Sequence, residues 1–191
     1  MKTLSKNIIV LAAAVFVFAI FILTNSVYGA QANVQSAIDN MDFERNSKNE
    51  ISLSFSSSGI NEVDRYVILR KDKTSKNFVE IKKIASKDVS KTGNITYTDK
   101  LSTTGYVRYE YRVDAYLKTG KVLKGKSIYA SNVLVCLDPG HFQTKNAVEG
   151  NEGYGYSEAM AVLKLGLSLR DTLKKDYGIS CVMTRTTESI T

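Results

Sequence analysis

The chain has 191 residues, with 26 Lys and Arg against 19 Asp and Glu, a formal net charge of +7, two cysteines and one histidine. Two cysteines without C-x-x-C spacing exclude a structural zinc site of the four-cysteine kind. A basic chain attracts nucleic acids or other anionic polymers, and the absence of a nucleic-acid-binding motif argues against the first. The lysines are spread along the chain, as is also typical of a solvated basic surface.

The first predicted segment, residues 1–32, is an export signal. Two lysines precede an apolar run over residues 8–23, and Ala30-Gln31-Ala32 supplies small residues for cleavage after Ala32. The run is slightly long for a signal and slightly short for a spanning helix, so an uncleaved membrane anchor is the alternative. In either case we expect an extracellular or cell-wall protein. Cleavage removes two lysines and no acid, which leaves a formal charge of +5.

Residues 33–49 are polar and mixed in charge, and Ala37, Ile38 and Met41 give only a faint helical stripe. We predict a linker or an extra first strand there. From residue 50 to residue 133 the apolar period becomes two, as in Ile51, Leu53 and Phe55. Several short alternating runs separated by turn residues predict an antiparallel all-β sandwich.

The segment over residues 50–133 resembles a fibronectin type III domain. The residues that carry the resemblance are Ile51-Ser-Leu-Ser-Phe55, Val63-Asp-Arg-Tyr-Val-Ile-Leu-Arg70, Tyr97-Thr-Asp99, Leu101, Tyr109-Glu-Tyr-Arg-Val-Asp-Ala115 and Ser131-Asn-Val133. The resemblance implies that the Tyr109 hydroxyl closes a tyrosine corner. Phe55 stands where the family usually has tryptophan. We expect the sandwich to be a spacer or wall-contact domain, with sugar binding as the alternative.

Residues 134–191 predict a strand, helix, strand unit. The apolar run Leu134–Leu137 reads as a strand buried on both faces and ends at Asp138-Pro139-Gly140, directly before His141. Ser157 is the expected N-cap of an amphipathic helix that Gly178 stops, and a second strand follows. The first strand's end and the helix start share one sheet edge, so we expect His141 and Glu158 to meet. An imidazole and a carboxylate there are suitable ligands for a catalytic zinc ion.

This last third of the chain resembles the zinc-dependent N-acetylmuramoyl-L-alanine amidases of bacterial peptidoglycan. The matching residues are Val135-Cys-Leu-Asp-Pro-Gly-His141, Glu158, and Tyr177-Gly-Ile-Ser-Cys-Val-Met-Thr-Arg185. The resemblance implies a partial α/β amidase domain in which His141 and Glu158 bind Zn²⁺. It also implies hydrolysis of the amide bond between N-acetylmuramic acid and L-alanine. The family's second histidine and its general-base glutamate have no counterpart here, so we expect a truncated domain, with the base beyond Thr191.

Several alternatives stay open. Glu149 or Glu152 could replace Glu158 as a ligand, and Glu158 could serve only the helix dipole. Cys136 and Cys181 could form a disulfide, although buried cysteines more often pack as small apolar residues. We expect little or no amidase activity from this chain and poor order in residues 134–191 alone. The competing function is a non-catalytic exported module that binds the cell wall through peptidoglycan or anionic wall polymers.

Overall fold

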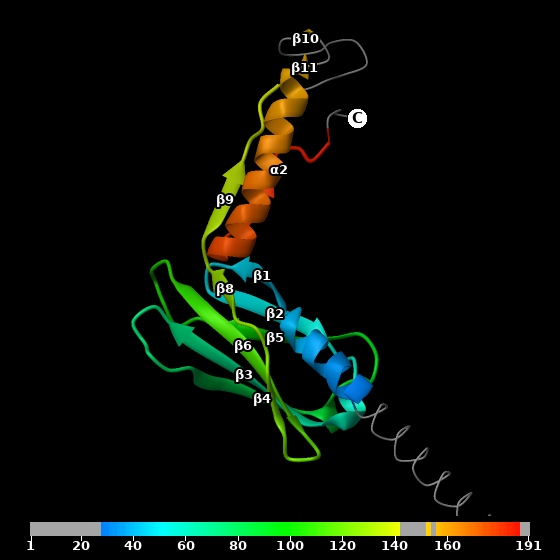
Figure 1. Ribbon diagram of the computed structural model, residues 1–191. Coiled ribbons are helices and arrows are strands. Elements are labelled where there is room, and N and C mark those ends of the chain that lie inside the picture. The colour runs from blue at the N-terminus through cyan, green and yellow to red at the C-terminus, as the bar shows by residue number, and fades with distance from the viewer. Residues whose placement is uncertain (1–27, 142–151, 154–155, 188–191) are drawn as a thin grey trace, which may run out of the picture.

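A computed structural model describes residues 28–141, 152–153 and 156–187 of the chain. A β-sandwich forms one part, and a long helix with its flanking strands stands at one end of it (Figure 1). The apolar run predicted as a signal or anchor, residues 8–23, lies outside these ranges. Within them, no helix combines the length and the apolar character needed to span a membrane.

The sandwich consists of two antiparallel sheets. The first has the strand order β1-β2-β5 and the second the order β4-β3-β6-β7, with β8 also paired to β6. The strands of the first sheet are β1 (Asp42–Ser47), β2 (Glu50–Ser56) and β5 (Asn94–Lys100). Those of the second are β3 (Val63–Asp72), β4 (Val79–Ala85), β6 (Arg108–Leu117), β7 (Val122–Lys124) and β8 (Ile128–Ser131). Two short 3₁₀ turns, η1 (Ile60–Glu62) and η2 (Ser86–Asp88), connect strands.

The core lies between the two sheets. Alternate residues of β2 point inward, so Ile51, Leu53 and Phe55 are at most 2% exposed. From the opposite sheet, the Tyr66 ring meets the Phe55 ring edge-on, with 5.1 Å between their centroids. This packing confirms the predicted antiparallel sandwich. The period of two identified the inward faces because each sheet has one buried side.

Two fully buried tyrosines of the second sheet differ in how their hydroxyls are bonded. The Tyr111 hydroxyl donates to Asp99 Oδ2 at 2.8 Å, and Arg70 binds the same oxygen at 2.8 Å. The Tyr66 hydroxyl has no partner among the described residues, and burial raises its pKa to about 12. The hydroxyl bond predicted for Tyr109 is thus made by Tyr111 to a side chain. The prediction of a tyrosine corner at Tyr109 is therefore wrong. The tyrosine of β6 whose hydroxyl is hydrogen-bonded is Tyr111, two positions after Tyr109.

Residues 33–49 do not form a linker. A helix over residues 28–39 precedes β1, and its Val34, Ala37 and Ile38 are at most 4% exposed. The alternative of an extra first strand is confirmed by β1, which pairs with β2. Burial against the sandwich stabilises a segment whose own helical pattern is faint. Ala32 lies within this helix. Cleavage after Ala32 stays a prediction. It would keep the buried residues Val34, Ala37 and Ile38 in the exported chain.

The C-terminal unit is a parallel strand pair with one long helix. Its elements are β9 (Leu134–Leu137), β10 (Glu152–Gly153), β11 (Tyr156–Ser157), α2 (Glu158–Tyr177) and β12 (Ser180–Met183). Strands β9 and β12 pair in parallel, as the strand, helix, strand pattern predicted. The predicted ends of the helix are confirmed: Ser157 Oγ accepts a hydrogen bond from the Met160 N–H, and Gly178 adopts the left-handed conformation with φ of 68°.

The expectation that β9 is buried on both faces is wrong. Its residues alternate between exposed and partly buried, because within the described residues α2 covers one face only. The paired residues Cys136 and Val182 lie on the open face, whereas Cys181 lies on the opposite face with Val135. Both cysteines are free. A disulfide between them would have to cross the sheet, which explains why it does not form.

The C-terminal unit joins the sandwich at Gly178. The Ser131 N–H donates to the Gly178 carbonyl oxygen at 2.8 Å, which links β8 to the end of α2. A Cβ atom on Gly178 would lie 2.3 Å from the Tyr129 carbonyl oxygen, so no side chain fits. Asn132, which is fully buried, holds the next turn by donating to the Lys48 and Gly105 carbonyls. The junction therefore consists mainly of backbone contacts.

We predict opposite effects for the two tyrosine hydroxyls. Tyr66→Phe removes a buried donor that has no partner and should raise the free energy of unfolding by up to about 1 kcal/mol. Tyr111→Phe leaves Asp99 without one of its donors and should lower it by about 1–3 kcal/mol. Urea denaturation of both variants measures this difference. Equal destabilisation by the two substitutions would contradict the assignment of the hydroxyl bonds.

We predict that Gly178→Ala weakens the junction between the sandwich and the C-terminal unit. Gly120 is the matched control: its φ is +85°, but nothing lies within 4 Å of its missing Cβ. Gly120→Ala should lower the free energy of unfolding by about 1–2 kcal/mol, which is the cost of the left-handed conformation alone. Gly178→Ala should lower the free energy of unfolding by roughly 2 kcal/mol more than Gly120→Ala does, because the Tyr129 backbone must move. Thermal and urea unfolding test this, and equal losses would show that the contact with Tyr129 is unimportant.

Candidate metal site

His141 lies where β9 ends and the chain turns. The Asp138-Pro139-Gly140 turn follows the strand, and His141 adopts φ of 56°, a left-handed conformation that few residues other than glycine occupy. Helix α2 lies close against this turn, because a Cβ atom on Gly166 would lie only 2.9 Å from Pro139 Cγ. The turn is thus held against the helix. Backbone strain of this kind is a reason to suspect function.

Glu158 is the first residue of α2 and lies beside His141. His141 Nε2 and Glu158 Oε1 are 3.4 Å apart, and the two side chains are 40% and 35% exposed. The N-cap at Ser157 fixes the start of the helix, and the positive end of the helix dipole favours the carboxylate. The expected meeting of these two residues is therefore confirmed. Their role as metal ligands stays a prediction.

The separation of the two atoms fits a shared zinc ion. With zinc bonds of about 2.0–2.2 Å to nitrogen and oxygen at a tetrahedral angle, two ligand atoms lie roughly 3.3–3.5 Å apart. The partial exposure of both side chains leaves room for water or a substrate carbonyl. Among the described residues, however, no three His, Cys, Asp or Glu side chains are grouped so as to hold a metal. The described part of the site therefore offers two ligands.

The other two candidate glutamates precede α2 in the chain. Glu149 lies outside the described residues, and Glu152 is described only as part of the short hairpin of β10 and β11. This hairpin leads directly into α2. Asp138, the acid nearest His141 in the sequence, accepts a hydrogen bond from Thr184 Oγ1. This bond links the turn after β9 to the residue after β12.

Arg185 connects the elements that carry His141 and Glu158. Its Nε donates to the Pro139 carbonyl at 2.9 Å, and its Nη2 donates to the carbonyls of Gly140 at 2.9 Å and Ala159 at 2.8 Å. One guanidinium thus binds the turn before His141 and the first turn of α2. In the sequence, Arg185 stands only as the last residue of the Tyr177–Arg185 motif, which predicts no role for its side chain. Its position in the sequence could have indicated this role. Arg185 follows β12, the parallel neighbour of β9, so it lies at the same sheet edge as the turn after β9.

No protein-family model matches the chain, and a search of curated proteins found no match. Similar solved structures include pectate lyase Pel3 from Pectobacterium carotovorum, with 19% identity over 52% of this chain and 33% of that chain (TM-score 0.36). The FN1–FN3 domains of chicken CNTN1 match with 18% identity over 48% and 30% (TM-score 0.36). BC0361, a polysaccharide deacetylase from Bacillus cereus, matches with 9% identity over 75% and 50% (TM-score 0.36).

The chain thus spans about a third of the pectate lyase and half of the deacetylase. Likenesses this weak assign no activity to the chain.

We predict that Arg185 orders the His141 turn. Arg185→Ala removes donors from four carbonyls, those of Pro139, Gly140, Ala159 and Thr187, and should destabilise the C-terminal unit by about 2 kcal/mol. Arg170→Ala is the control, because Arg170 forms an exposed ion pair with its neighbour Asp171 and should lose at most about 0.5 kcal/mol. Amide hydrogen exchange in the first turn of α2 should accelerate in the first variant only. Unchanged exchange in Arg185→Ala would contradict this role.

Proposed function

We propose that the C-terminal unit carries part of the zinc site of a peptidoglycan hydrolase of the N-acetylmuramoyl-L-alanine amidase type. The observation that carries the proposal is the 3.4 Å separation of His141 Nε2 and Glu158 Oε1 at the edge where β9 ends and α2 begins. The proposal is supported by the agreement of this separation with zinc geometry. It is also supported by the resemblance of the Val135–His141 and Tyr177–Arg185 motifs to that family.

The residues of this chain would act as holders and positioners. His141 in its neutral form and Glu158 as a carboxylate would bind Zn²⁺, and Arg185 would keep their backbones in place. When bound, the metal would lower the pKa of a water molecule and polarise the scissile carbonyl. The substrate would be the amide bond between N-acetylmuramic acid and L-alanine. The described residues offer only two ligands, so we expect weak metal binding. No described residue near the pair is assigned as general base, so we expect little hydrolysis.

The sandwich supports a second, wall-contact function. Residues 50–133 contain sixteen Lys and Arg against nine Asp and Glu, a formal excess of +7. Such a domain is attracted to anionic polymers of a cell surface, and the attraction weakens with salt. The finer assignment of a fibronectin type III-like domain is supported by two sheets in the orders β1-β2-β5 and β4-β3-β6-β7. An exported protein, extracellular or anchored through residues 8–23, would meet both peptidoglycan and these polymers.

Zinc calorimetry tests the amidase proposal. Wild type should bind one Zn²⁺ weakly, and His141→Ala and Glu158→Gln should each weaken binding by at least about tenfold. Asp171→Asn is the matched control, because it removes one carboxylate from the exposed side of the same helix. Purified peptidoglycan should release little stem peptide, and any release should depend on zinc.

Zinc binding that the His141 and Glu158 variants leave unchanged would overturn the assigned ligands. Efficient zinc-dependent release of stem peptide would contradict the expectation of an incomplete site.

A further inference from the structure

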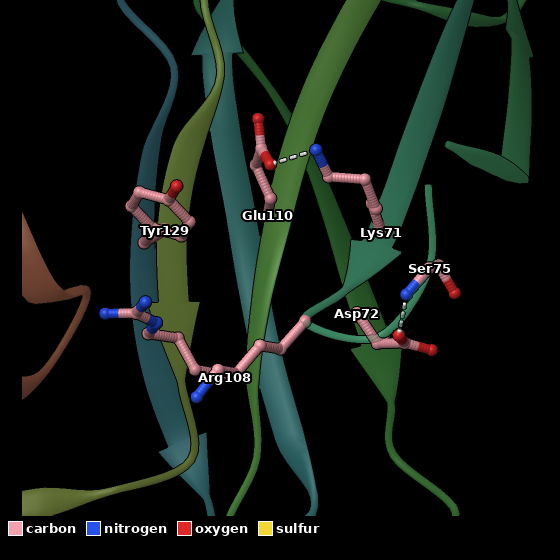
Figure 2. A pocket seen from close by; sticks show the side chains of 7 residues that line it. Lys71, Asp72, Ser75, Arg108, Glu110 and Tyr129 are labelled. Carbon is pink, nitrogen blue, oxygen red and sulfur yellow. Dashed lines mark hydrogen bonds and ion pairs between the residues drawn. The ribbon is translucent and has the colours of Figure 1, made fainter. Parts of the chain in front are cut away.

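A hollow of about 200 Å³ opens on the sandwich. It lies where β3 ends, β6 begins and β8 runs beside β6 (Figure 2). Seven residues line it, namely Lys71, Asp72, Lys73, Ser75, Arg108, Glu110 and Tyr129. Its lining combines charged groups of both signs with one aromatic ring.

The two acids of the hollow are bound internally. Glu110 forms an ion pair with Lys71 at 2.6 Å, drawn in Figure 2. Burial opposes the charge of Glu110, but hydrogen bonds from Lys71 and Ser127 outweigh it and lower the Glu110 pKa. Asp72 accepts hydrogen bonds from Thr74 Oγ1 at 2.7 Å and from the Ser75 N–H at 2.7 Å. These bonds, all to Oδ1, lower the Asp72 pKa to about 2, so both acids stay ionised at neutral pH.

Two cations of the hollow lack an acidic partner. Among the described residues, neither Arg108 nor Lys73 forms an ion pair. The Arg108 guanidinium instead stacks on the Tyr129 ring, with its central carbon 4.6 Å from the ring centroid. Tyr129 is 40% exposed, so the stacked pair faces solvent. Stacking holds the guanidinium plane in one orientation while its N–H groups remain available, an arrangement suited to bidentate binding of a phosphate or carboxylate.

We propose that Arg108, Lys73 and Tyr129 form a binding site for anionic oxygen groups, phosphate or carboxylate, repeated along a cell-wall polymer. The inference rests on the wall-contact function proposed for the sandwich and needs no activity at the His141 turn. A hollow of this size holds one anionic group and part of one sugar or polyol unit. A repeating polymer would bind along the basic surface of the sandwich, with this hollow as the point where one group is bound specifically.

The test uses the full chain and three soluble polymers: poly(glycerol phosphate), alginate as the carboxylate polymer, and neutral dextran. Arg108→Ala and Tyr129→Ala remove the site. Arg65→Ala is a charge-matched control, because Arg65 stacks on Tyr116 at 4.0 Å in the same sheet but does not line the hollow. Unfolding midpoints of all variants verify that the sandwich stays folded.

We expect binding of at least one anionic polymer, weakened about tenfold by Arg108→Ala and Tyr129→Ala and less than twofold by Arg65→Ala. The polymer that binds identifies phosphate or carboxylate as the source of the anion. Equal weakening by Arg65→Ala and Arg108→Ala would overturn the specific site and leave a general charge attraction. Absence of binding to both anionic polymers, or equal binding to dextran, would overturn the wall-contact function as well.

Discussion

The candidate metal site depends on one constraint, the parallel pairing of β9 and β12 across a single helix. Two parallel strands end at the same edge of a sheet, and the helix that joins them begins at that edge. Three separate stretches, at His141, Glu158 and Arg185, therefore meet there. Arg185 then binds the carbonyls of Gly140 and Ala159. A guanidinium suits this place because it presents several donors in a rigid plane.

The same helix that begins at the site ends on the sandwich. Gly178 packs so closely on β8 that a Cβ atom has no room, and its carbonyl accepts from the Ser131 N–H. The Lys174–Asp42 ion pair at 2.9 Å adds little, because both side chains are well exposed. The unit otherwise leaves apolar groups in solvent, as at Leu165, which is 70% exposed. Its stability therefore depends strongly on this backbone junction.

Local patterns predicted the parts of the fold that local physics decides. The alternation of Ile51, Leu53 and Phe55 identified a half-buried strand, and Ser157 and Gly178 marked the ends of α2 because caps are made by neighbouring residues. The meeting of His141 with Glu158 followed from topology alone.

Other features depend on distant parts of the chain, and the sequence pattern missed them. The helix over residues 28–39 forms because Val34 and Ile38 are buried against the sandwich. The polar residues around them make this apolar pattern too weak to recognise in the sequence. The apolar run of β9 does not reveal how many helices cover the strand. The carbonyls bound by Arg185 could not be predicted either, because the sequence does not show where the guanidinium of a long side chain lies.

The imidazole of His141 gives the most direct test of the central claim, since the chain has no other histidine. Its ring resonances in a ¹H–¹⁵N spectrum are therefore unambiguous and can be followed during titration with Zn²⁺. A shift of the Nε2 resonance that saturates at one equivalent in wild type and is lost in Glu158→Gln is predicted. A ring spectrum that zinc leaves unchanged, or one that shifts equally without the Glu158 carboxylate, would contradict the account of a shared metal site.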